Sequence, residues 1–361
     1  WINDIGNKQL LFQGRGGTGK TAILLSLAWR LWKTKGARIL VLTYNRALAA
    51  DMNRLLTLMG MIDEVGAPLI KVQTVHSFLY HALKALGVVN QYEGDFLANY
   101  ENIKEEAFEM LTIDALTSED LNAMVTSDPN TLDWDYIFID EAQDWPENER
   151  DLLHRLYRPE RFVVADGKDQ YVRQDHSCDW TRGNSKVTSL QVPLSQGLRM
   201  KSNLVRFANL IASELGLLSW SIDQNPEAHG GQVIVVEGDY RHAQSIHENV
   251  MKKSQESGNS PVDSLMCVPP HLVIETVEGR TSYGQELADL WGFNCWDGVR
   301  SDTRKNYPTE IDQLRIVQYD SCRGLEGWSL FALGLDRFYE RKLNTAPNPD
   351  SEALVDIPTL H

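Results

Sequence analysis

The stretch Gly14–Thr21 reads Gly-Arg-Gly-Gly-Thr-Gly-Lys-Thr, and it lies between an apolar run that predicts a strand and an apolar run that predicts a helix. A glycine-rich turn in this position directs backbone N–H groups and a helix N-terminus at one point, which suits phosphate oxygens. In this spacing Lys20 reaches the β- and γ-phosphates, and the Thr21 hydroxyl is a ligand of Mg²⁺. The full spacing in this context favours a phosphate-binding loop over a chance turn. The chain is therefore expected to bind a nucleoside triphosphate through Gly14, Gly16, Gly17, Thr18, Gly19, Lys20 and Thr21.

The composition is that of an ordinary globular protein, with 42% hydrophobic and 24% charged residues among 361. Such a length exceeds what one small core needs, so two or three domains are expected. The four cysteines are scattered without a Cys-x-x-Cys pair, which argues against a zinc site or a disulfide framework. Because there is also no export signal and no run of eighteen apolar residues, we expect a cytoplasmic protein without a membrane span.

The net charge of −15 does not exclude a nucleic-acid partner. Binding to a nucleic acid depends on local basic patches rather than on the sum of the charges. Part of the acidity is concentrated in Glu101–Asp120. We interpret this stretch as the solvated face of a helical insertion near Asp95–Val125.

Strand-like and helix-like segments alternate along the chain, as they do in proteins with a parallel α/β sheet. In the first half the predicted strands are Lys8–Gln13, Arg38–Thr43, Leu69–Gln73, Tyr136–Asp140 and Arg161–Asp166. The predicted helices between them are Thr21–Lys33, Ala47–Met59, Ser77–Leu86 and Glu147–Tyr157. A second alternation starts near Val187, with strands at Gln232–Val236, Leu265–Val268, Leu314–Tyr319 and Ser329–Leu335, and helices at Ser202–Leu215 and His242–Ser254. The pattern predicts an α/β fold with two sheets.

A second motif lies at the end of the predicted strand Tyr136–Asp140, where the carboxylates of Asp140 and Glu141 follow an apolar run. In ATP-hydrolysing proteins with a phosphate loop, such a carboxylate holds Mg²⁺ through its water shell. We therefore expect Asp140 and Thr21 to bind Mg²⁺, and Glu141 to polarise the attacking water as general base. An apolar strand that ends in Asp-Glu is common by itself, and the motif gains weight from the loop at Gly14–Thr21.

The string Asp-Glu-Ala-Gln at 140–143 resembles the second motif of superfamily 1 helicases of the UvrD/Rep type, and other motifs follow in that family's order. Thr43–Met52 resembles the single-strand contact motif, and Thr74–Phe78 is similar to the Thr-x-His-Ser-Phe signature. Later stretches resemble the third motif, the fourth motif and the Ser-Lys-Gly-Leu-Glu stretch, at Val163–Gln170, Leu198–Asn203 and Ser321–Glu326.

This resemblance implies two RecA-like P-loop lobes, residues 1–185 with a small helical insertion at about 90–130, and residues 186–361. The spacing between the predicted strands Leu265–Val268 and Leu314–Tyr319 leaves no room for the large accessory insertion of the best-known family members. It implies ATP and Mg²⁺ as cofactors. By motif position the catalytic residues are Lys20, Asp140, Glu141, Gln170 and Arg199. Further nucleotide contacts are Gln143 and Glu326, and the nucleic-acid contacts are Tyr44, Asn45, Arg46, His76, Ser77 and Phe78.

Several of these residues allow two interpretations from their chemistry alone. Tyr44, just beyond a strand end, can stack on a base for about 1–3 kcal/mol, or it can cap the edge of the core. His76 can hydrogen-bond to phosphate or sugar, which positions a strand without reading its sequence, or it can be a buried histidine with satisfied partners. Arg199 has the fork geometry that suits a phosphate, or it anchors the next helix. Trp180 can stack on a base, although a single tryptophan more often packs in a core.

Four features depart from the family pattern. Nothing before Gly14 clearly supplies the glutamine that recognises adenine, for which Gln9 and Gln13 are candidates, and Leu198 stands where an aromatic residue usually stacks on the base. Gln170 is one residue further from Asp166 than usual. No Thr-Arg-Ala-Arg-like sixth motif, which carries the arginine finger, follows in the remaining sequence. Because the chain also opens on tryptophan, we expect a fragment truncated before that motif.

The favoured function is the motor core of an ATP-dependent helicase or translocase on single-stranded nucleic acid, with DNA and 3′-to-5′ movement expected from the resemblance. Stacking and phosphate contacts are shared by DNA and RNA, so the residues themselves leave that choice open. An ATP-gated binding or regulatory module of a repair or defence assembly is the alternative, with a nuclease or another domain fused or bound at either end. A kinase or signalling ATPase with a phosphate loop is a third interpretation.

Overall fold

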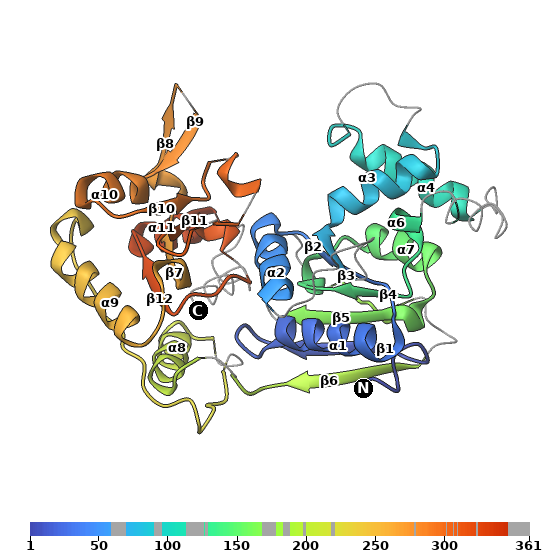
Figure 1. Ribbon diagram of the computed structural model, residues 1–361, viewed down its shortest axis with the longest axis horizontal. Coiled ribbons are helices and arrows are strands. Elements are labelled where there is room, and N and C mark those ends of the chain that lie inside the picture. The colour runs from blue at the N-terminus through green and yellow to red at the C-terminus, as the bar shows by residue number, and fades with distance from the viewer. Residues whose placement is uncertain are drawn as a thin grey trace. The chain divides into compact units, whose positions relative to one another are not determined.

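The computed structural model describes residues 1–58, 70–89, 96–112, 126, 129–167, 178–182, 188–197, 200–217, 221–277, 279–300, 302–305, 307–308, 310–322 and 324–345. The chain divides into two compact units. The first unit comprises Trp1–Tyr44 and Met52–Ser195, and the second comprises Asn45–Asp51 and Gln196–His361. Each unit contains a parallel sheet with helices around it (Figure 1). The predicted fold class, α/β with two parallel-sheet lobes of the RecA-like kind, is confirmed.

The sheet of the first unit has six parallel strands in the order β3-β2-β4-β5-β1-β6. The strands are β1 (Gln9–Gly14), β2 (Ile39–Thr43), β3 (Ile70–Thr74), β4 (Tyr136–Ile139), β5 (Phe162–Gly167) and β6 (Ser189–Leu194). The helices in this part of the chain are α1 (Lys20–Lys35), α2 (Arg46–Leu58), α3 (Val75–Ala85), α4 (Tyr100–Thr112), α6 (Pro129–Leu132) and α7 (Glu147–Leu156). The first part of α2, up to Asp51, belongs to the second unit. The five strands and four helices that the sequence predicts for this half are all present. β6 follows the predicted boundary at 185–186 and pairs with β1.

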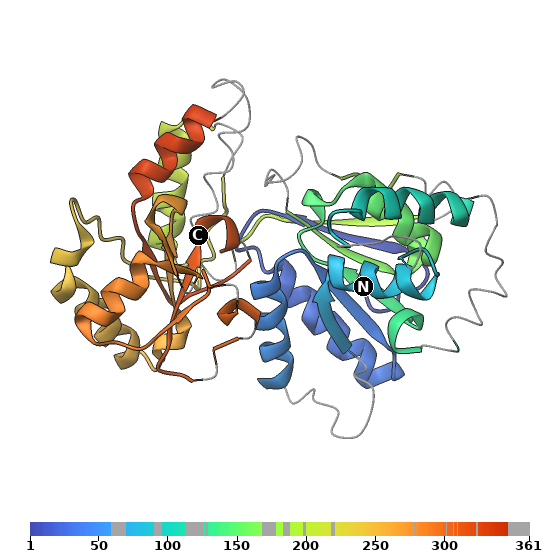
Figure 2. The ribbon, with the colours of Figure 1, turned by 90° about the horizontal axis from the view of Figure 1, so that it is seen from above.

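Helices cover both faces of this sheet, which explains why its central strands β2, β4 and β5 are apolar except near their ends. Every residue of β2 and of β5 is buried. On one face, side chains of β1, β2, β4 and β5 join those of α3, α4 and α7 in a single core, whereas α1 packs against β1 and β5 (Figure 2). In these central strands polar groups are therefore confined to the ends, whereas the edge strands β3 and β6 carry Lys71 and Gln191 within their length.

Helix α4 belongs to the predicted helical insertion and is amphipathic. It exposes Glu101, Glu105 and Glu109, and it buries Ile103 and Leu111 in the core shared with α7. The interpretation of this acidic stretch as a solvated helix face is confirmed as far as Thr112. The remainder of the stretch, up to Asp120, lies outside the described residues.

The second unit contains a four-stranded parallel sheet in the order β10-β11-β7-β12 and a separate antiparallel hairpin of β8 and β9. The strands are β7 (Ser264–Val268), β8 (Val273–Thr276), β9 (Gly279–Ser282), β10 (Cys295–Asp297), β11 (Leu314–Gln318) and β12 (Ser329–Ala332). The helices are α8 (Ser202–Glu214), α9 (Gln244–Glu256), α10 (Tyr283–Trp291) and α11 (Leu335–Thr345). Among the described residues between β7 and β11 there are only short elements, as expected without a large accessory insertion.

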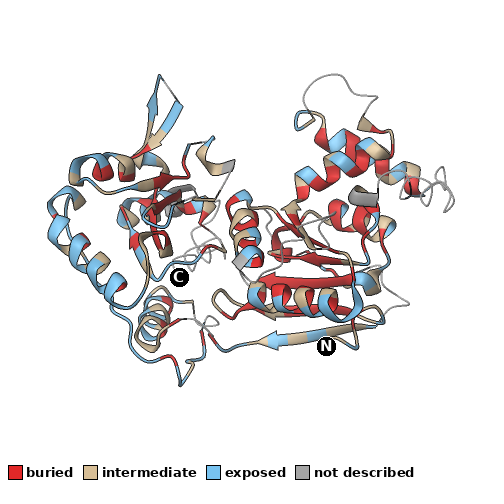
Figure 3. Ribbon diagram, in the orientation of Figure 1, coloured by how far each residue is buried: buried red, intermediate tan, exposed pale blue. Residues whose placement is uncertain are grey.

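One predicted strand of this unit is wrong. Gln232–Val236 forms no strand, and its Val235 side chain is 77% exposed. Its β-branched residues favour a strand, but β structure also needs a pairing partner, and none of the described strands pairs with this segment. Figure 3 shows a difference in burial between the two units, because the strands of the first unit are mostly buried while α9 of the second is largely exposed.

In the part of the chain that is described, no helix is long and apolar enough to span a membrane.

Candidate functional site

The glycine-rich loop connects the end of β1 to the start of α1. Gly17 and Gly19 have φ angles of 75° and 82°, which residues with a Cβ atom rarely adopt. At Gly14 the constraint is close approach, since a Cβ there would lie 2.6 Å from the carbonyl oxygen of Leu194 and 2.7 Å from Oγ1 of Thr18. The loop backbone thus requires glycine at several of the positions that the sequence pattern singles out.

Lys20, the first residue of α1, folds back over this loop. Its buried ammonium donates hydrogen bonds to the carbonyl oxygens of Gly14 and Arg15, at 2.7 Å and 3.0 Å. The Thr18 hydroxyl donates to the carbonyl oxygen of Arg15 at 2.8 Å. The lysine is therefore held at the N-terminus of α1, where an anion is favoured by the helix dipole and by backbone N–H groups.

Thr21 and Asp140, the two predicted Mg²⁺ ligands, lie in contact. Oγ1 of Thr21 donates to Oδ2 of Asp140 at 2.8 Å, although the residues are 119 positions apart. Asp140 is fully buried at the end of β4, and burial, together with the charge of Glu141, raises the pKa of its carboxyl to about 6. The Thr21 hydrogen bond and the charge of Lys20 oppose this shift.

A divalent cation fits this pair, because its charge would offset the burial that disfavours the ionised Asp140. Mg²⁺ is usually held by one or two carboxylates together with substrate phosphates rather than by a full cage of protein ligands. The described residues include no cluster of three or more His, Cys, Asp or Glu side chains that could hold a metal ion. The site suits a metal that arrives with a nucleotide.

Glu141 has a left-handed backbone conformation, with φ at 51°, and no other described residue apart from glycine has a positive φ. Such a conformation costs on the order of 1–3 kcal/mol and is most frequent at functional sites. Its Oε2 accepts a hydrogen bond from Nε2 of Gln143 at 2.7 Å. Oε1 of the buried Gln143 in turn accepts from the backbone N–H of Gly167 at 2.6 Å. The Gln143 amide thus connects Glu141 to the last residue of β5.

The residues predicted for strand contact lie at the ends of β2 and β3. The rings of Tyr44 and His76 meet edge to face with centroids 5.5 Å apart, and both residues are half-buried. Ser77 is exposed, and its backbone N–H is capped by the Thr74 hydroxyl. Phe78 is fully buried and offers no surface to a strand.

Asn45 caps the start of α2, because its Oδ1 accepts from the backbone N–H groups of Ala47 and Leu48. Arg46 is exposed. Glu326 is exposed in the second unit, and its carbonyl oxygen accepts from the Arg315 guanidinium. Gln170 and Arg199 lie outside the described residues.

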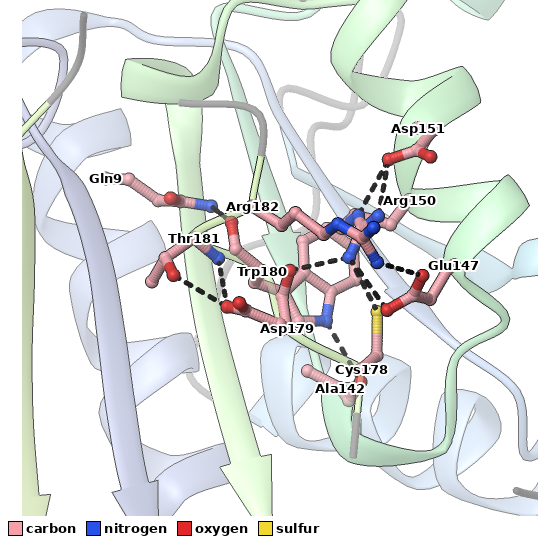
Figure 4. Close-up of polar contacts among 10 residues, drawn as sticks. All are labelled: Gln9, Ala142, Glu147, Arg150, Asp151, Cys178, Asp179, Trp180, Thr181 and Arg182. Atoms are coloured by element: carbon pink, nitrogen blue, oxygen red, sulfur yellow. Dashed lines mark hydrogen bonds and ion pairs between the residues drawn. The ribbon is translucent and has the colours of Figure 1, made fainter. Parts of the chain in front are cut away.

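Trp180 and Gln9 are structural, which answers two questions that the sequence leaves open. Trp180 is 1% exposed, and its indole N–H donates to the carbonyl oxygen of Ala142 at 3.0 Å (Figure 4). Gln9 is buried, donates to the carbonyl oxygen of Trp180 and accepts from the Ser189 hydroxyl. Neither side chain is placed to stack on a base or to recognise adenine. Gln13 contacts Asp166 through its side-chain amide.

Glu149 is the site residue that sequence reasoning misses. It is 1% exposed on α7, and it accepts hydrogen bonds from the hydroxyl groups of Tyr44 and Tyr100 and from Lys104. A glutamate inside a helical run normally indicates a solvated face, so the sequence gives no sign of this role. Lys104 does leave a signal, because it stands at an apolar position of α4 between the buried Ile103 and Ala107.

A family model described as an AAA domain matches residues 2–174, which include the phosphate loop and the Asp140–Glu141 pair. Domains that match this model are found in UvrD/Rep-like helicases. Over this half of the chain the predicted resemblance to superfamily 1 helicases is confirmed.

Among solved structures, the chain is similar to the crystal structure of the Pif1 helicase from Candida albicans, with 15% identity and a TM-score of 0.33. The match covers 69% of this chain and 52% of that chain, so this chain spans about half the length of the solved one. A likeness at this level carries no argument about function. No curated protein matches the chain in sequence.

Proposed function

We propose that the chain is the motor core of an ATP-dependent helicase or translocase that acts on single-stranded nucleic acid. The observation that carries the proposal is the contact between Thr21 and Asp140, since it joins the phosphate loop and the Asp-Glu strand end in one site. The two RecA-like lobes of this motor are proposed to be residues 1–185 and 186–361. Movement 3′ to 5′ on DNA is proposed from the family resemblance.

In the proposed reaction, Lys20 exchanges its contacts with the loop carbonyl oxygens for oxygens of the β- and γ-phosphates of ATP. Thr21 and Asp140 hold Mg²⁺, which neutralises charge on the phosphate oxygens when bound. Gln170 and Arg199 are proposed to face the γ-phosphate by their positions in the motifs, and Glu326 the ribose.

Glu141 is the proposed general base for the water that attacks the γ-phosphorus. Because Gln143 holds Oε2 of this carboxylate, Oε1 is the atom proposed to take the proton from the water. The role of Gln143 is then to orient Glu141 rather than to contact the nucleotide directly. Its second bond, to Gly167, ties that orientation to the strand that precedes the predicted third motif.

The nucleic acid is proposed to lie along Tyr44, Asn45, Arg46, His76 and Ser77. Half-buried rings at the ends of two neighbouring strands suit the stacking of bases, and exposed polar and charged groups beside them suit the backbone. Such contacts are independent of base sequence, as a motor requires.

The test is ATP hydrolysis with and without a single-stranded DNA or RNA oligonucleotide, for the unaltered chain and for Lys20→Ala and Glu141→Gln. Because no arginine-finger motif occurs in this sequence, and such an arginine contributes about 10³–10⁵ to turnover, we expect a slow strand-stimulated rate, which Lys20→Ala should abolish through lost nucleotide binding. Glu141→Gln should keep nucleotide binding and lower turnover by about 10²–10⁴-fold, the usual contribution of a general base. Lys252→Ala and Glu105→Gln, which alter exposed side chains, serve as matched controls.

Turnover that persists in both site variants would refute the assignment of the site. If neither this chain nor a longer chain that carries the arginine motif shows strand-stimulated hydrolysis, although both bind nucleotide, the ATP-gated binding module replaces the motor. End-labelled oligonucleotides that report the direction of movement decide the polarity, and parallel DNA and RNA series decide the substrate.

A further inference from the structure

A buried carboxylate lies behind the predicted strand-contact residues. Glu149 of α7 accepts hydrogen bonds from the Tyr44 hydroxyl at Oε2 and from the Tyr100 hydroxyl at Oε1, the latter at 2.9 Å. The ammonium of Lys104 donates to the same Oε1 at 3.1 Å. Of these three donors, Tyr44 directly follows β2 and the other two belong to α4, so Glu149 of α7 connects segments that are far apart in the sequence.

The charge of Glu149 is balanced inside the protein rather than by solvent. The side chains of Glu149 and Lys104 are each 2% exposed, and Lys104 also contacts Glu101 at 2.8 Å and the ring of Tyr100 at 4.3 Å from its centroid. A buried ion pair is tolerated only where good geometry and further hydrogen bonds offset the loss of hydration. Here the two tyrosine hydroxyl groups supply those bonds, which fixes their positions.

This arrangement determines which part of Tyr44 can meet a ligand. Its hydroxyl group is directed at Glu149, and its ring is packed edge to face against His76 on one side and Trp145 on another, with centroids 5.5 Å and 5.2 Å apart. The ring of His76 also contacts that of Tyr100, at 5.1 Å. Both predicted strand-contact rings are thus held, directly or through Tyr100, by one carboxylate.

We propose that Glu149 is a positioning residue for the strand-binding surface of Tyr44 and His76, and that this surface takes unpaired bases by ring contact rather than by the tyrosine hydroxyl. The proposal rests on the proposed function and deepens it. Glu149 does not touch the strand. It holds the Tyr44 ring in one orientation, so that a base meets a preformed surface and the ordering of the ring adds no cost at binding.

The test compares Tyr44→Phe, Glu149→Gln and the double variant, with a fluorescent oligothymidine as the probe. Tyr44→Phe removes only the group that reaches Glu149 and retains the stacking ring. Each single variant should weaken strand affinity about 5- to 10-fold, and the double variant should be no weaker than the worse single one, because both remove the same contact. In ATPase assays the strand concentration for half-maximal stimulation should rise, while the rate at saturating strand stays within about twofold.

Tyr157→Phe is the matched control. Tyr157 is buried in the same unit, and its hydroxyl donates to the carbonyl oxygen of Leu132 at 2.9 Å, so its loss removes a comparable hydrogen bond elsewhere in the core. This variant should bind the oligothymidine as the unaltered chain does.

Two results would overturn the inference. Tyr44→Phe and Glu149→Gln variants that melt earlier but bind the strand normally would show that the network serves only the fold. Additive losses of affinity would show that the two residues act separately. An unaltered chain that binds no single strand overturns the proposed strand contact and this inference together, whereas normal binding by the variants overturns the inference alone.

Discussion

The two sheets of this protein differ in how completely they are covered. In the first unit every residue of β2 and of β5 is buried, and chemically active side chains lie at the strand ends. In the second unit β7 is buried throughout, but β12 leaves Leu330 at 37% exposure, and large apolar side chains such as Leu210, Val235 and Trp328 are more than half exposed. Where both faces of a strand are covered, polar groups lie at the strand ends, and in the first unit these ends carry the chemically active side chains.

The largest expected effect comes from adding one methyl group to each unit. At Gly14 the added Cβ would meet backbone and loop atoms at 2.6–2.7 Å, whereas at Gly284 of α10 it would meet the side chains of Ile316 and Met266 at 2.9–3.0 Å. Gly14→Ala should lower nucleotide affinity by at least about 100-fold, because the phosphate loop must shift. Gly284→Ala should cost about 1–3 kcal/mol of stability and leave nucleotide affinity unchanged.

Titration with a fluorescent nucleotide and chemical denaturation of both variants measure these effects. Equal losses of nucleotide affinity in the two variants would contradict the assignment of nucleotide binding to the phosphate loop of the first unit.

A buried cation of the first unit can be compared with an exposed one of the second. Lys104 is 2% exposed in its pair with Glu149, and Lys252 is 73% exposed in its pair with Glu256. Lys104→Met leaves a buried charge without its partner and should cost about 3–5 kcal/mol in the free energy of unfolding. Lys252→Met should cost less than about 1 kcal/mol. Urea denaturation decides, and similar costs for the two variants would mean that Lys104 is not buried in solution.

Acid sensitivity should be similar in the two units, because each contains a histidine largely withdrawn from solvent: His247 is buried and His154 is half-buried. Burial, and for His154 also the charge of Arg150, lowers the pKa of His154 and of His247 to about 4. In the unfolded chain a histidine titrates near 6.5, so between pH 6.5 and 4 the unfolded state binds more protons and the folded state loses stability as the pH falls.

Each histidine should account for up to about 3 kcal/mol of this loss. His247→Gln and His154→Gln should each flatten the curve of unfolding free energy against pH, whereas the exposed His229→Gln should not. A curve that is unchanged in all three variants would place both histidines in water.

The smallest expected effect is the cost in stability of the buried Asp140 carboxylate in the first unit. Burial raises the pKa of Asp140 from its ordinary value near 3.8 to about 6, so the folded state is penalised increasingly from pH 3.8 to 6 and fully above that range. Without metal at pH 8, Asp140→Asn should therefore raise stability by roughly 2–3 kcal/mol, and the gain should vanish near pH 4.

The same substitution should abolish the increase in nucleotide affinity that Mg²⁺ produces. Thermal unfolding in a chelator, with a Mg²⁺ titration in parallel, measures both properties. If the Asp140→Asn variant is less stable than the unaltered chain at pH 8, the conclusion that burial of the ionised Asp140 carboxylate lowers stability is wrong.

The covered strands of the first unit can be predicted from the sequence because they contain apolar runs, and the phosphate loop because its spacing is fixed by phosphate geometry. The edge strand β6, with Gln191 and Pro193 exposed, is not among the predicted strands. The segment Gln232–Val236 shows the limit of this reasoning. Its valines have the same local preference as a true strand, but pairing is decided by residues elsewhere in the chain.

The site shows a similar limit. The meeting of Thr21 and Asp140 follows from the two motifs, whereas the bond between Tyr44 and Glu149 joins residues 105 positions apart with no motif to link them. Gln143 is recognised by its motif, but its bonds to Glu141 and Gly167 depend on how two strand ends lie side by side.

Two separate requirements restrict which residues can replace Glu141. The reaction requires its carboxylate, and the left-handed backbone requires a residue that can adopt a φ of 51°. Alanine meets neither requirement, so an inactive Glu141→Ala variant would not distinguish the loss of the carboxylate from a change in the backbone. Glutamine keeps the shape and removes the charge, whereas glycine relaxes the backbone and removes the side chain. Any mutational scan of this loop will therefore rank substitutions by conformation as well as by charge, and glycine should rank as the most stable of the inactive variants.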